Sequence, residues 1–307
     1  MYPEKEPTLK TPHSYRYRVV DVFTNNQLEG NPLAVFPDAR GLDTSTMQKI
    51  ALELNLSETT FVFPASRKDC AVAVRIFTPR SEMLFAGHPT IGTSFVLLDE
   101  GIVAKETKQF ALEEKIGSVP IRVEPGDQPR IWLRTPPITF GMLSDRAVCA
   151  KSLGLPLSDL LDVPPQLVTA GNPTFFIALK DKAAVDRAEM DLSGVKAIKG
   201  DCAGAVCIFV FAPTDTGAYS RMFAQEYGII EDPATGSSTG PLAAYMMRHG
   251  LVSGVSGTQF ISEQGVKMGR RSLLHVLING DQGADGIEIG GHVAPLVEAT
   301  MTLPSAT

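Results

Sequence analysis

Two short segments of the chain carry residue types that could bind an anion at the start of a helix. They are residues 87–94 (GHPTIGTS) and residues 231–238 (EDPATGSS). We expect Pro89 and Pro233 to occupy the first position of a helix, where a missing N–H is harmless. The residues before them, His88 and Asp232, would then be the N-caps. Small residues follow each proline and would leave the N–H groups of the first turn open to a substrate carboxylate. Ordinary capped helices are the alternative interpretation.

Glu58 is a further candidate for chemistry, because it precedes a stretch of apolar and threonine residues, TTFVF (residues 59–63). A carboxyl group beside such a strand would be partly shielded from water, which suits general acid–base catalysis near neutral pH. A solvated charge or a helix cap is the other interpretation of a single glutamate at a strand end.

The two helix-start segments belong to an internal repeat. Each is preceded by an Arg-x-Phe triplet, at residues 75–77 and 221–223, and each predicted helix is followed by a glycine, Gly101 or Gly250. A Gly-Asn-Pro triplet also occurs twice, at residues 30–32 and 171–173. Because these matches come in the same order, the sequence predicts two similar halves whose helix starts face one cleft.

Other patterns place the elements around these segments. β-rich stretches predict strands at residues 15–23, 31–36, 58–63, 71–77, 167–179 and 205–211. Ser45 and Gln48 would form a capping box for a helix that ends at Asn55, a residue tolerant of the left-handed conformation. Proline pairs at residues 136–137 and 164–165 flank loop-rich material, which we expect to be the linker between the halves.

The composition narrows the class of protein. A chain of 307 residues, 44% of them hydrophobic, is long enough for about two domains with substantial cores. The net charge of −6, without a basic stripe, argues against a nucleic-acid partner. No apolar run has the length of a membrane helix, and residues 1–14 lack the apolar stretch of a signal peptide. We therefore expect a cytoplasmic protein.

The sequence contains no cofactor motif. The spacing of its cysteines and histidines fits no zinc, iron–sulfur or redox motif, and no nucleotide-binding glycine motif occurs. We therefore expect neither a metal nor a cofactor. In a reducing compartment the cysteines are expected to be neutral thiols, namely Cys70, Cys149, Cys202 and Cys207.

Five segments, taken in order, form a specific set of motifs. They are DVFTNNQLEGNPLAVF (residues 21–36), NLSETTFVFP (55–64), RIFTPRSEMLFAGHPTIGT (75–93), EDPATGSS (231–238) and EQGVKMGRRS (263–272). This set resembles the phenazine-biosynthesis PhzF-like proteins, which share the fold of diaminopimelate epimerase, and the resemblance extends over residues 15–300. It implies an α+β fold of two pseudo-symmetric domains, each an antiparallel sheet curled around a central helix, with the active site between them.

The resemblance and the repeat together suggest how the chain is divided. We expect a flexible tail over residues 1–14, an N-terminal domain over 15–130 and a C-terminal domain over 131–292. A strand near residues 293–303 is expected to return to the N-terminal domain.

The resemblance also implies an activity and the residues that perform it. It implies a cofactor-independent, biosynthetic isomerase that moves a proton on a small cyclic amino or hydroxy acid such as trans-2,3-dihydro-3-hydroxyanthranilate. Glu58 would be the acid–base catalyst, while His88 and Asp232 would bind and polarise the substrate. The residues expected to contact the substrate are Gly87, Gly236, Ser237 and Asn31.

Two other functions stay open from the sequence. An amino-acid epimerase or racemase could use His88 and Asp232 as its two bases, and a non-catalytic protein could bind a small carboxylate. A racemase that uses thiols is disfavoured, because related epimerases carry paired cysteines at the two helix starts, and none of the four cysteines lies near His88 or Asp232 in sequence. The expected partners are a small-molecule carboxylate and a second copy in a homodimer, with no nucleic acid and no membrane.

Overall fold

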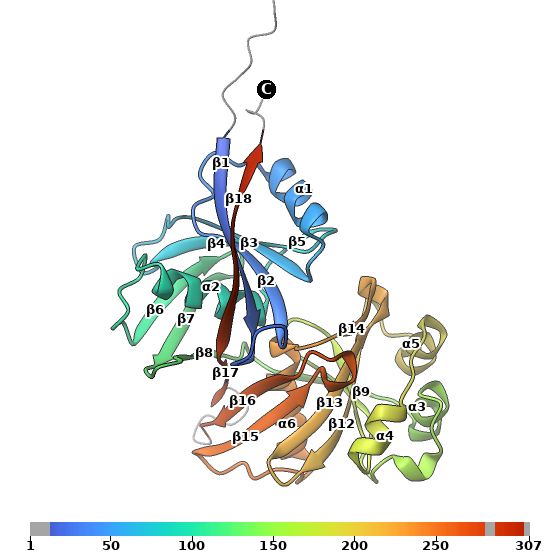
Figure 1. Ribbon diagram of the computed structural model, residues 1–307. Coiled ribbons are helices and arrows are strands. Elements are labelled where there is room, and N and C mark those ends of the chain that lie inside the picture. Colours follow the sequence, from blue (N-terminus) through green and yellow to red (C-terminus); the bar gives the residue numbers. More distant parts are fainter. Residues whose placement is uncertain (1–12, 280–285, 304–307) are drawn as a thin grey trace, which may run out of the picture.

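The computed structural model describes residues 13–279 and 286–303, and within them the chain forms two similar halves (Figure 1). The repeated series in the first half is β2 (Asn31–Phe36), β3 (Glu58–Pro64), β4 (Val72–Phe77), β5 (Glu82–Met83), α2 (Gly87–Asp99), β6 (Gln109–Glu114), β7 (Gly117–Glu124) and β8 (Arg130–Arg134). The second half repeats it as β11 (Thr174–Ala178), β12 (Cys207–Thr214), β13 (Gly217–Ala224), β14 (Ile229–Asp232), α6 (Gly236–Arg248), β15 (Thr258–Gln264), β16 (Ser272–Ile278) and β17 (Ile287–Gly291).

The strand pairings repeat as well. β2 pairs in parallel with β3, and β4 with β6, as β11 does with β12 and β13 with β15. The pairs β3–β4 and β6–β7, like β12–β13 and β15–β16, are antiparallel. The predicted pair of similar halves is confirmed, although each sheet is mixed and not purely antiparallel. Period-two alternation along a strand does not reveal the direction of its neighbour, so the sequence could not show this.

The two halves exchange their outermost strands. β1 (His13–Val22) pairs with β2 and with the last strand, β18 (Val293–Leu303), which runs back along the first half in Figure 1. The equivalent strand of the second half, β10 (Gln166–Thr169), pairs with β11 and with β9 (Thr139–Leu143), which follows the first half along the chain. The strand that follows the first half along the chain, β9, therefore belongs to the second sheet. The strand that follows the second half, β18, belongs to the first sheet.

Among the described strands, one pair, β8 with β17, joins the two halves. β8 pairs with β7 of the first half and also with β17 of the second, where Leu133 lies opposite Ile289. The boundary expected between residues 130 and 131 falls at the start of β8, inside this shared pair. The tail expected over residues 1–14 lies outside the described residues up to residue 12, and His13 and Ser14 already belong to β1.

The two central helices are enclosed by the curled sheets (Figure 1). α2 packs on strands that include β1, β2 and β8, and α6 packs on β10, β11, β16 and β17. Ile91 and Leu97 of α2 and Leu242 and Tyr245 of α6 are all buried in one continuous hydrophobic core. Burying a large apolar side chain contributes about 1.5–3 kcal/mol, so these helices anchor both halves. The expected α+β fold with a helix inside each sheet is confirmed.

Shorter helices fill the connections. α1 (Thr44–Leu54) joins β2 to β3, α4 (Lys182–Arg187) and α5 (Leu192–Lys199) join β11 to β12, and α3 (Arg146–Ser152) joins β9 to β10. Three 3₁₀ turns, Leu157–Asp159, Gln225–Tyr227 and Val266–Met268, complete the described elements. Of the helices in the described part of the chain, none is both long and apolar enough to cross a bilayer.

Two local predictions are wrong and one is confirmed. α1 begins two residues earlier than expected, because the Asp43 side chain accepts a hydrogen bond from the Thr46 N–H and is the N-cap in place of Ser45. Gln48 does not complete a capping box but donates to the Thr78 carbonyl. Asn55 ends α1 in the left-handed conformation, with φ of 49°, as predicted.

The predicted linker over residues 136–165 is part of the second half. It contains β9 and α3, and α3 packs on α5. Because β9 is short, the proline pairs dominated the local pattern and concealed this strand.

Candidate active site

The starts of the two central helices meet. Gly87 and Gly236 are the first residues of α2 and α6. A Cβ atom added to Gly87 would lie 3.1 Å from the Ser237 nitrogen and 3.2 Å from the Gly236 carbonyl carbon. The prediction that both helix starts face one place is therefore confirmed, and glycine is needed there because two backbones approach each other.

The predicted N-caps are wrong. Pro89 is the third residue of α2, and Pro233 lies three residues before α6 begins. The capping positions belong to Ala86 and Thr235, neither of which makes a side-chain capping bond. His88 is thus inside the first turn of α2, and Asp232 is the last residue of β14.

This shift changes which residues correspond across the two halves. Both helices have 13 residues, and in each the fourth residue is a threonine whose hydroxyl donates to the residue before the helix: Thr90 to Ala86 over 2.7 Å and Thr239 to Thr235 over 2.9 Å. The counterpart of His88 is therefore Ser237, the second residue of α6, and not Asp232. The glycines after the helices, Gly101 and Gly250, both have positive φ, as expected of helix ends.

The repeated Gly-Asn-Pro triplets support the same correspondence. Asn31 lies 3.4 Å from His88, measured from Nδ2 to Nδ1. Asn172 donates from Nδ2 to the Ser237 hydroxyl over 2.9 Å. Each asparagine thus contacts the second residue of the helix in its own half.

Glu58 and His88 form a close, buried pair of ionisable side chains in this region. Glu58 is the first residue of β3 and only 9% exposed, and His88 is 6% exposed. Glu58 Oε2 and His88 Nε2 are 3.0 Å apart. Neither atom has another hydrogen-bond partner among the described residues, so both keep capacity to bind a ligand.

Asp232 joins the same cluster from the second half. Its Oδ1 accepts from Asn31 Nδ2 over 2.9 Å, and its Oδ2 accepts from the Thr235 hydroxyl. Burial raises the pKa of Asp232 to about 6; the nearby His88 opposes this rise and the nearby Glu58 adds to it. Asn31, which is completely buried, therefore contacts both His88 of the first half and Asp232 of the second half.

Ser237 and Gly236 form the remaining wall. Gly236 packs against the Phe23 ring, since an added Cβ would lie 3.0 Å from Phe23 Cζ. The open N–H groups of two helix first turns, together with the positive ends of two helix dipoles, make this meeting point suited to a carboxylate. The seven residues predicted for the site, Glu58, His88, Asp232, Gly87, Gly236, Ser237 and Asn31, all lie in the region where the two helix starts meet.

The structure adds three residues that the sequence analysis missed. Asn172 donates to the Ser237 hydroxyl, and the Thr235 hydroxyl donates to Asp232. Gln264 stabilises the loop from Asp232 to Thr235. The Gln264 amide donates to the Asp232 carbonyl over 2.7 Å and accepts from the Thr235 N–H over 3.1 Å. Asn172 could have been found from the second Gly-Asn-Pro triplet, but no local signal marked Thr235 or Gln264.

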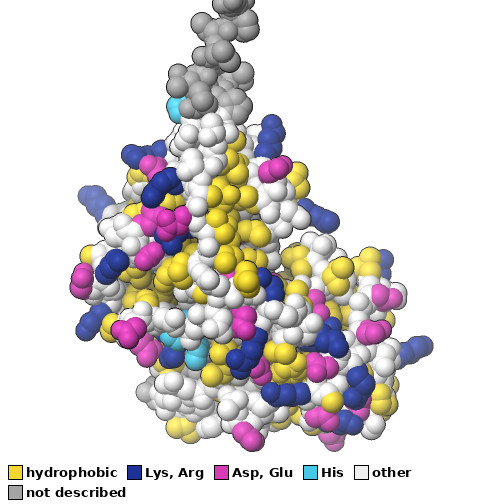
Figure 2. Space-filling model, viewed as in Figure 1, with side chains coloured by type: hydrophobic (Ala, Val, Ile, Leu, Met, Phe, Trp, Pro, Cys, Tyr) yellow, Lys and Arg dark blue, Asp and Glu magenta, His cyan; other side chains and the backbone are white. Residues whose placement is uncertain are grey.

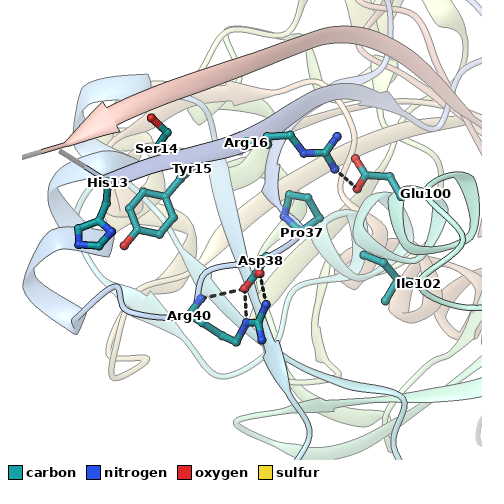
Figure 3. A pocket seen from close by; sticks show the side chains of 9 residues that line it. All are labelled: His13, Ser14, Tyr15, Arg16, Pro37, Asp38, Arg40, Glu100 and Ile102. Carbon is teal, nitrogen blue, oxygen red and sulfur yellow. Dashed lines mark hydrogen bonds and ion pairs between the residues drawn. The ribbon is translucent and has the colours of Figure 1, made fainter. Parts of the chain in front are cut away.

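A separate cavity of about 550 Å³ includes none of these residues. It is lined by β1 residues such as His13 and Tyr15, and Figure 3 shows that its charged groups bind each other. Arg16 pairs with Glu100 over 2.7 Å and Arg40 with Asp38 over 2.5 Å. Among the described residues, no group of three or more His, Cys, Asp or Glu side chains is arranged to hold a metal ion.

Comparison with known proteins identifies the type of fold. A hydroxyproline epimerase from Agrobacterium vitis superposes with a TM-score of 0.64 at 14% identity, over 95% of this chain and 93% of that one, and so shares the fold. A PhzF-family phenazine biosynthesis protein from Bacillus anthracis superposes with a TM-score of 0.85 at 26% identity, over 94% and 99% of the two chains. The chain thus has the diaminopimelate epimerase type of fold, with two halves around facing helix starts.

The sequence comparisons identify the family. Residues 20–299 match the phenazine biosynthesis-like protein family. Over 293 residues the chain is 34% identical to the trans-2,3-dihydro-3-hydroxyanthranilate isomerase of Pseudomonas aeruginosa, covering 92% of this chain and 98% of that protein. The chain belongs to the phenazine biosynthesis-like family and is an isomerase of the PhzF type.

Proposed function

We propose that Glu58 moves a proton between two carbons of a small cyclic amino or hydroxy acid, of the class of trans-2,3-dihydro-3-hydroxyanthranilate. The observation that carries this proposal is the buried pair of Glu58 Oε2 and His88 Nε2, 3.0 Å apart and without other hydrogen-bond partners among the described residues. The activity named for the Pseudomonas aeruginosa relative supports the substrate class.

The proposed reaction needs only one acid–base group. The Glu58 carboxylate removes a proton from one ring carbon, the electron pair moves along the conjugated system, and the same carboxyl returns the proton to another carbon. Atoms and electrons balance without an external reagent. The N–H groups at the starts of α2 and α6 would hold the substrate carboxylate and its developing negative charge.

His88 and Asp232 would orient the polar groups of the ring. Asp232, with its pKa raised to about 6, is mostly ionised at neutral pH and can accept a hydrogen bond from an amino or hydroxyl group. His88, whose Nε2 lies 3.0 Å from Glu58 Oε2, would hold that carboxyl in place. Positioning of this kind accounts for a large share of enzymatic rate enhancement.

A racemase that uses His88 and Asp232 as opposed bases has less support. Such an enzyme needs its bases on opposite faces of one carbon. Here Asn31 Nδ2 lies 3.4 Å from His88 Nδ1 and 2.9 Å from Asp232 Oδ1. Both groups contact the same Asn31 amide nitrogen, and the other ring nitrogen of His88, Nε2, faces Glu58.

Deuterium incorporation from D₂O into a candidate cyclic amino acid tests the proposal. Wild type should incorporate deuterium, and Glu58→Gln should bind the ligand but incorporate none. Glu53→Gln, an equivalent change at an exposed position of α1, should behave like wild type. Undiminished exchange in Glu58→Gln would refute the role of Glu58, and binding without exchange in wild type would indicate a non-catalytic carboxylate-binding protein.

A further inference from the structure

Glu114 is a buried carboxyl group that the proposed reaction does not use. It is the last residue of β6, is 4% exposed, and its Oε1 lies 2.6 Å from the Thr90 hydroxyl oxygen in α2. Its Oε2 has no hydrogen-bond partner among the described residues. Burial raises the pKa of Glu114 to about 8.

The hydrogen bonds around Thr90 determine which form of Glu114 fits. The Thr90 hydroxyl has a single proton, yet it faces the Ala86 carbonyl at 2.7 Å and Glu114 at 2.6 Å. The carbonyl can only accept, so the hydroxyl donates to Ala86, a common bond of helical threonines. Glu114 must then donate to the hydroxyl, and only a protonated carboxyl can do so.

The second half has a neutral donor at the equivalent position. Gln264 is the last residue of β15, as Glu114 is of β6, and the preceding residues of both strands pair with matching positions of β4 and β13. Its amide Nε2 lies 3.1 Å from the Thr235 hydroxyl and 2.7 Å from the Asp232 carbonyl. An amide donates without carrying a charge, as a protonated Glu114 does.

We propose that Glu114 is a carboxylic acid in the folded protein and acts as a positioning residue for the start of α2. By donating its proton to the Thr90 hydroxyl, Glu114 keeps that hydroxyl oriented to donate to the Ala86 carbonyl. Gly87 and His88 lie between Ala86 and Thr90 in the chain, so this bond stabilises the turn that carries them. Loss of the proton would place a buried charge against an oxygen with no proton to give, and would loosen the turn that carries His88. The inference rests on the proposed function only where turnover is measured.

Nearby charged groups are engaged elsewhere and do not replace this proton. Those of β6, the following turn, β7 and α2 are paired as follows: Glu113 with Ser66 and the Arg67 N–H, Lys115 with Glu82, Arg122 with Glu288, Glu124 with Trp132 and Arg130, His88 with Glu58, and Asp99 with Arg18. The protonation of Glu114 therefore follows from burial and from Thr90.

Urea unfolding of wild type and Glu114→Gln between pH 6 and pH 9 tests the proposal. The folded protein keeps the proton up to about pH 8, whereas the unfolded chain loses it near 4.5. Unfolding then releases a proton from Glu114 between about pH 6 and pH 8, so wild-type stability decreases as the pH rises over this range. The folding constant should fall by up to about tenfold per pH unit. Asp232 titrates lower, at about 6, so its contribution to this fall is small above about pH 7 and is shared by wild type and variants.

Glu114→Gln keeps a donor and removes the titration, so the fall between pH 6 and pH 8 should disappear. The control is Glu113→Gln, which neutralises the adjacent carboxyl, whose pKa is lowered chiefly by the Ser66 hydroxyl, and should keep the wild-type slope. Equal slopes in wild type and Glu114→Gln would overturn the proposal. If Glu114→Gln does not fold, the wild-type infrared spectrum decides. A protonated carboxyl band at pH 7 that vanishes by pH 9 supports the proposal, and its absence at pH 7 overturns it.

The positioning role has its own readout in the pH profile of turnover. Wild-type kcat/KM should decline above about pH 8, the decline should be absent in Glu114→Gln, and Glu114→Ala should be slower at every pH. A decline that is the same in wild type and Glu114→Gln would contradict the positioning role. If no candidate substrate is turned over, the proposed function fails while the unfolding experiment still decides the state of Glu114.

Discussion

The two halves share a scaffold but differ in the chemistry that they place on it. Glu58 is the first residue of β3 and lies opposite Leu33, two residues after Asn31. The same position in the second half, the first residue of β12 opposite Thr174, is Cys207. Burial, together with the charges of Asp232 and Glu226, raises the pKa of the Cys207 thiol to about 12. A carboxyl that can exchange protons is thus matched by a thiol that stays protonated.

The helix starts differ in the same way. His88 occupies the second position of α2 and Ser237 that of α6. The duplicated part supplies backbone N–H groups, which suit any carboxylate ligand. The titratable side chains are unequal, which suits a reaction that uses one base in place of two matched bases.

The largest expected effect separates Glu58 from Cys207. Glu58→Gln should lower kcat by about 10⁴-fold or more, the upper end of what a general acid–base group contributes. Cys207→Ala should change kcat by less than about tenfold, because it only removes a buried sulfur atom. Steady-state kinetics with thermal unfolding as a folding control makes the comparison. Similar losses in both variants would show that both halves supply acid–base groups.

The next effect compares two equivalent ion pairs in stability. Arg221 pairs with Glu231 at 2.8 Å with a side chain 9% exposed, and also donates to the Ala188 carbonyl. Arg75 pairs with Glu82 at 2.7 Å but is 31% exposed. Arg221→Ala should cost about 3–5 kcal/mol, since it leaves a buried carboxylate unpaired. Arg75→Ala should cost about 1 kcal/mol or less. Denaturant unfolding measures both, and equal costs would mean that burial does not distinguish the halves.

A smaller effect concerns the contact between the helix starts. The Cβ of Gly87→Ala would lie 3.1 Å from the backbone nitrogen of Ser237, so the two helices must move apart slightly. A misplacement of this size should weaken binding of a carboxylate ligand such as 3-hydroxyanthranilate by about tenfold to a hundredfold. Gly126→Ala is the control, because its nearest neighbour is 3.6 Å away. Calorimetric titration measures the affinities, and unchanged binding in Gly87→Ala would show that the contact does not shape the site.

The repeat in the sequence was sufficient to predict the two halves and the meeting of their helices, but it could not fix the register of the helix starts. Matching Pro89 to Pro233 aligned His88 with Asp232. The N–H groups of a helix's first turn have no partner within the helix, so a proline is tolerated at several positions there. Pro89 accordingly lies within α2 and Pro233 outside α6.

The rest of the site depends on contacts between distant parts of the chain. The burial of Glu58 was predictable, because its apolar neighbours indicated shielding from water. Gln264 and Thr235 were not, because their value lies in the bonds by which Gln264 joins Thr235 and Asp232, 29 and 32 residues away. A polar residue whose partner is supplied by a neighbouring strand leaves no periodic signal in its own segment.

The pairing of β1 with β18, from His13 and Leu303 to Val22 and Val293, has a consequence for how the protein is made. Translation proceeds at about 5–20 residues per second, so β1 leaves the ribosome some tens of seconds before β18 exists. During that interval one edge of β1 has unpaired N–H and C=O groups, which can bind a strand of another nascent chain. β18 therefore closes the first half late in synthesis, and crowded polysomes are a setting in which this protein is exposed to misassembly.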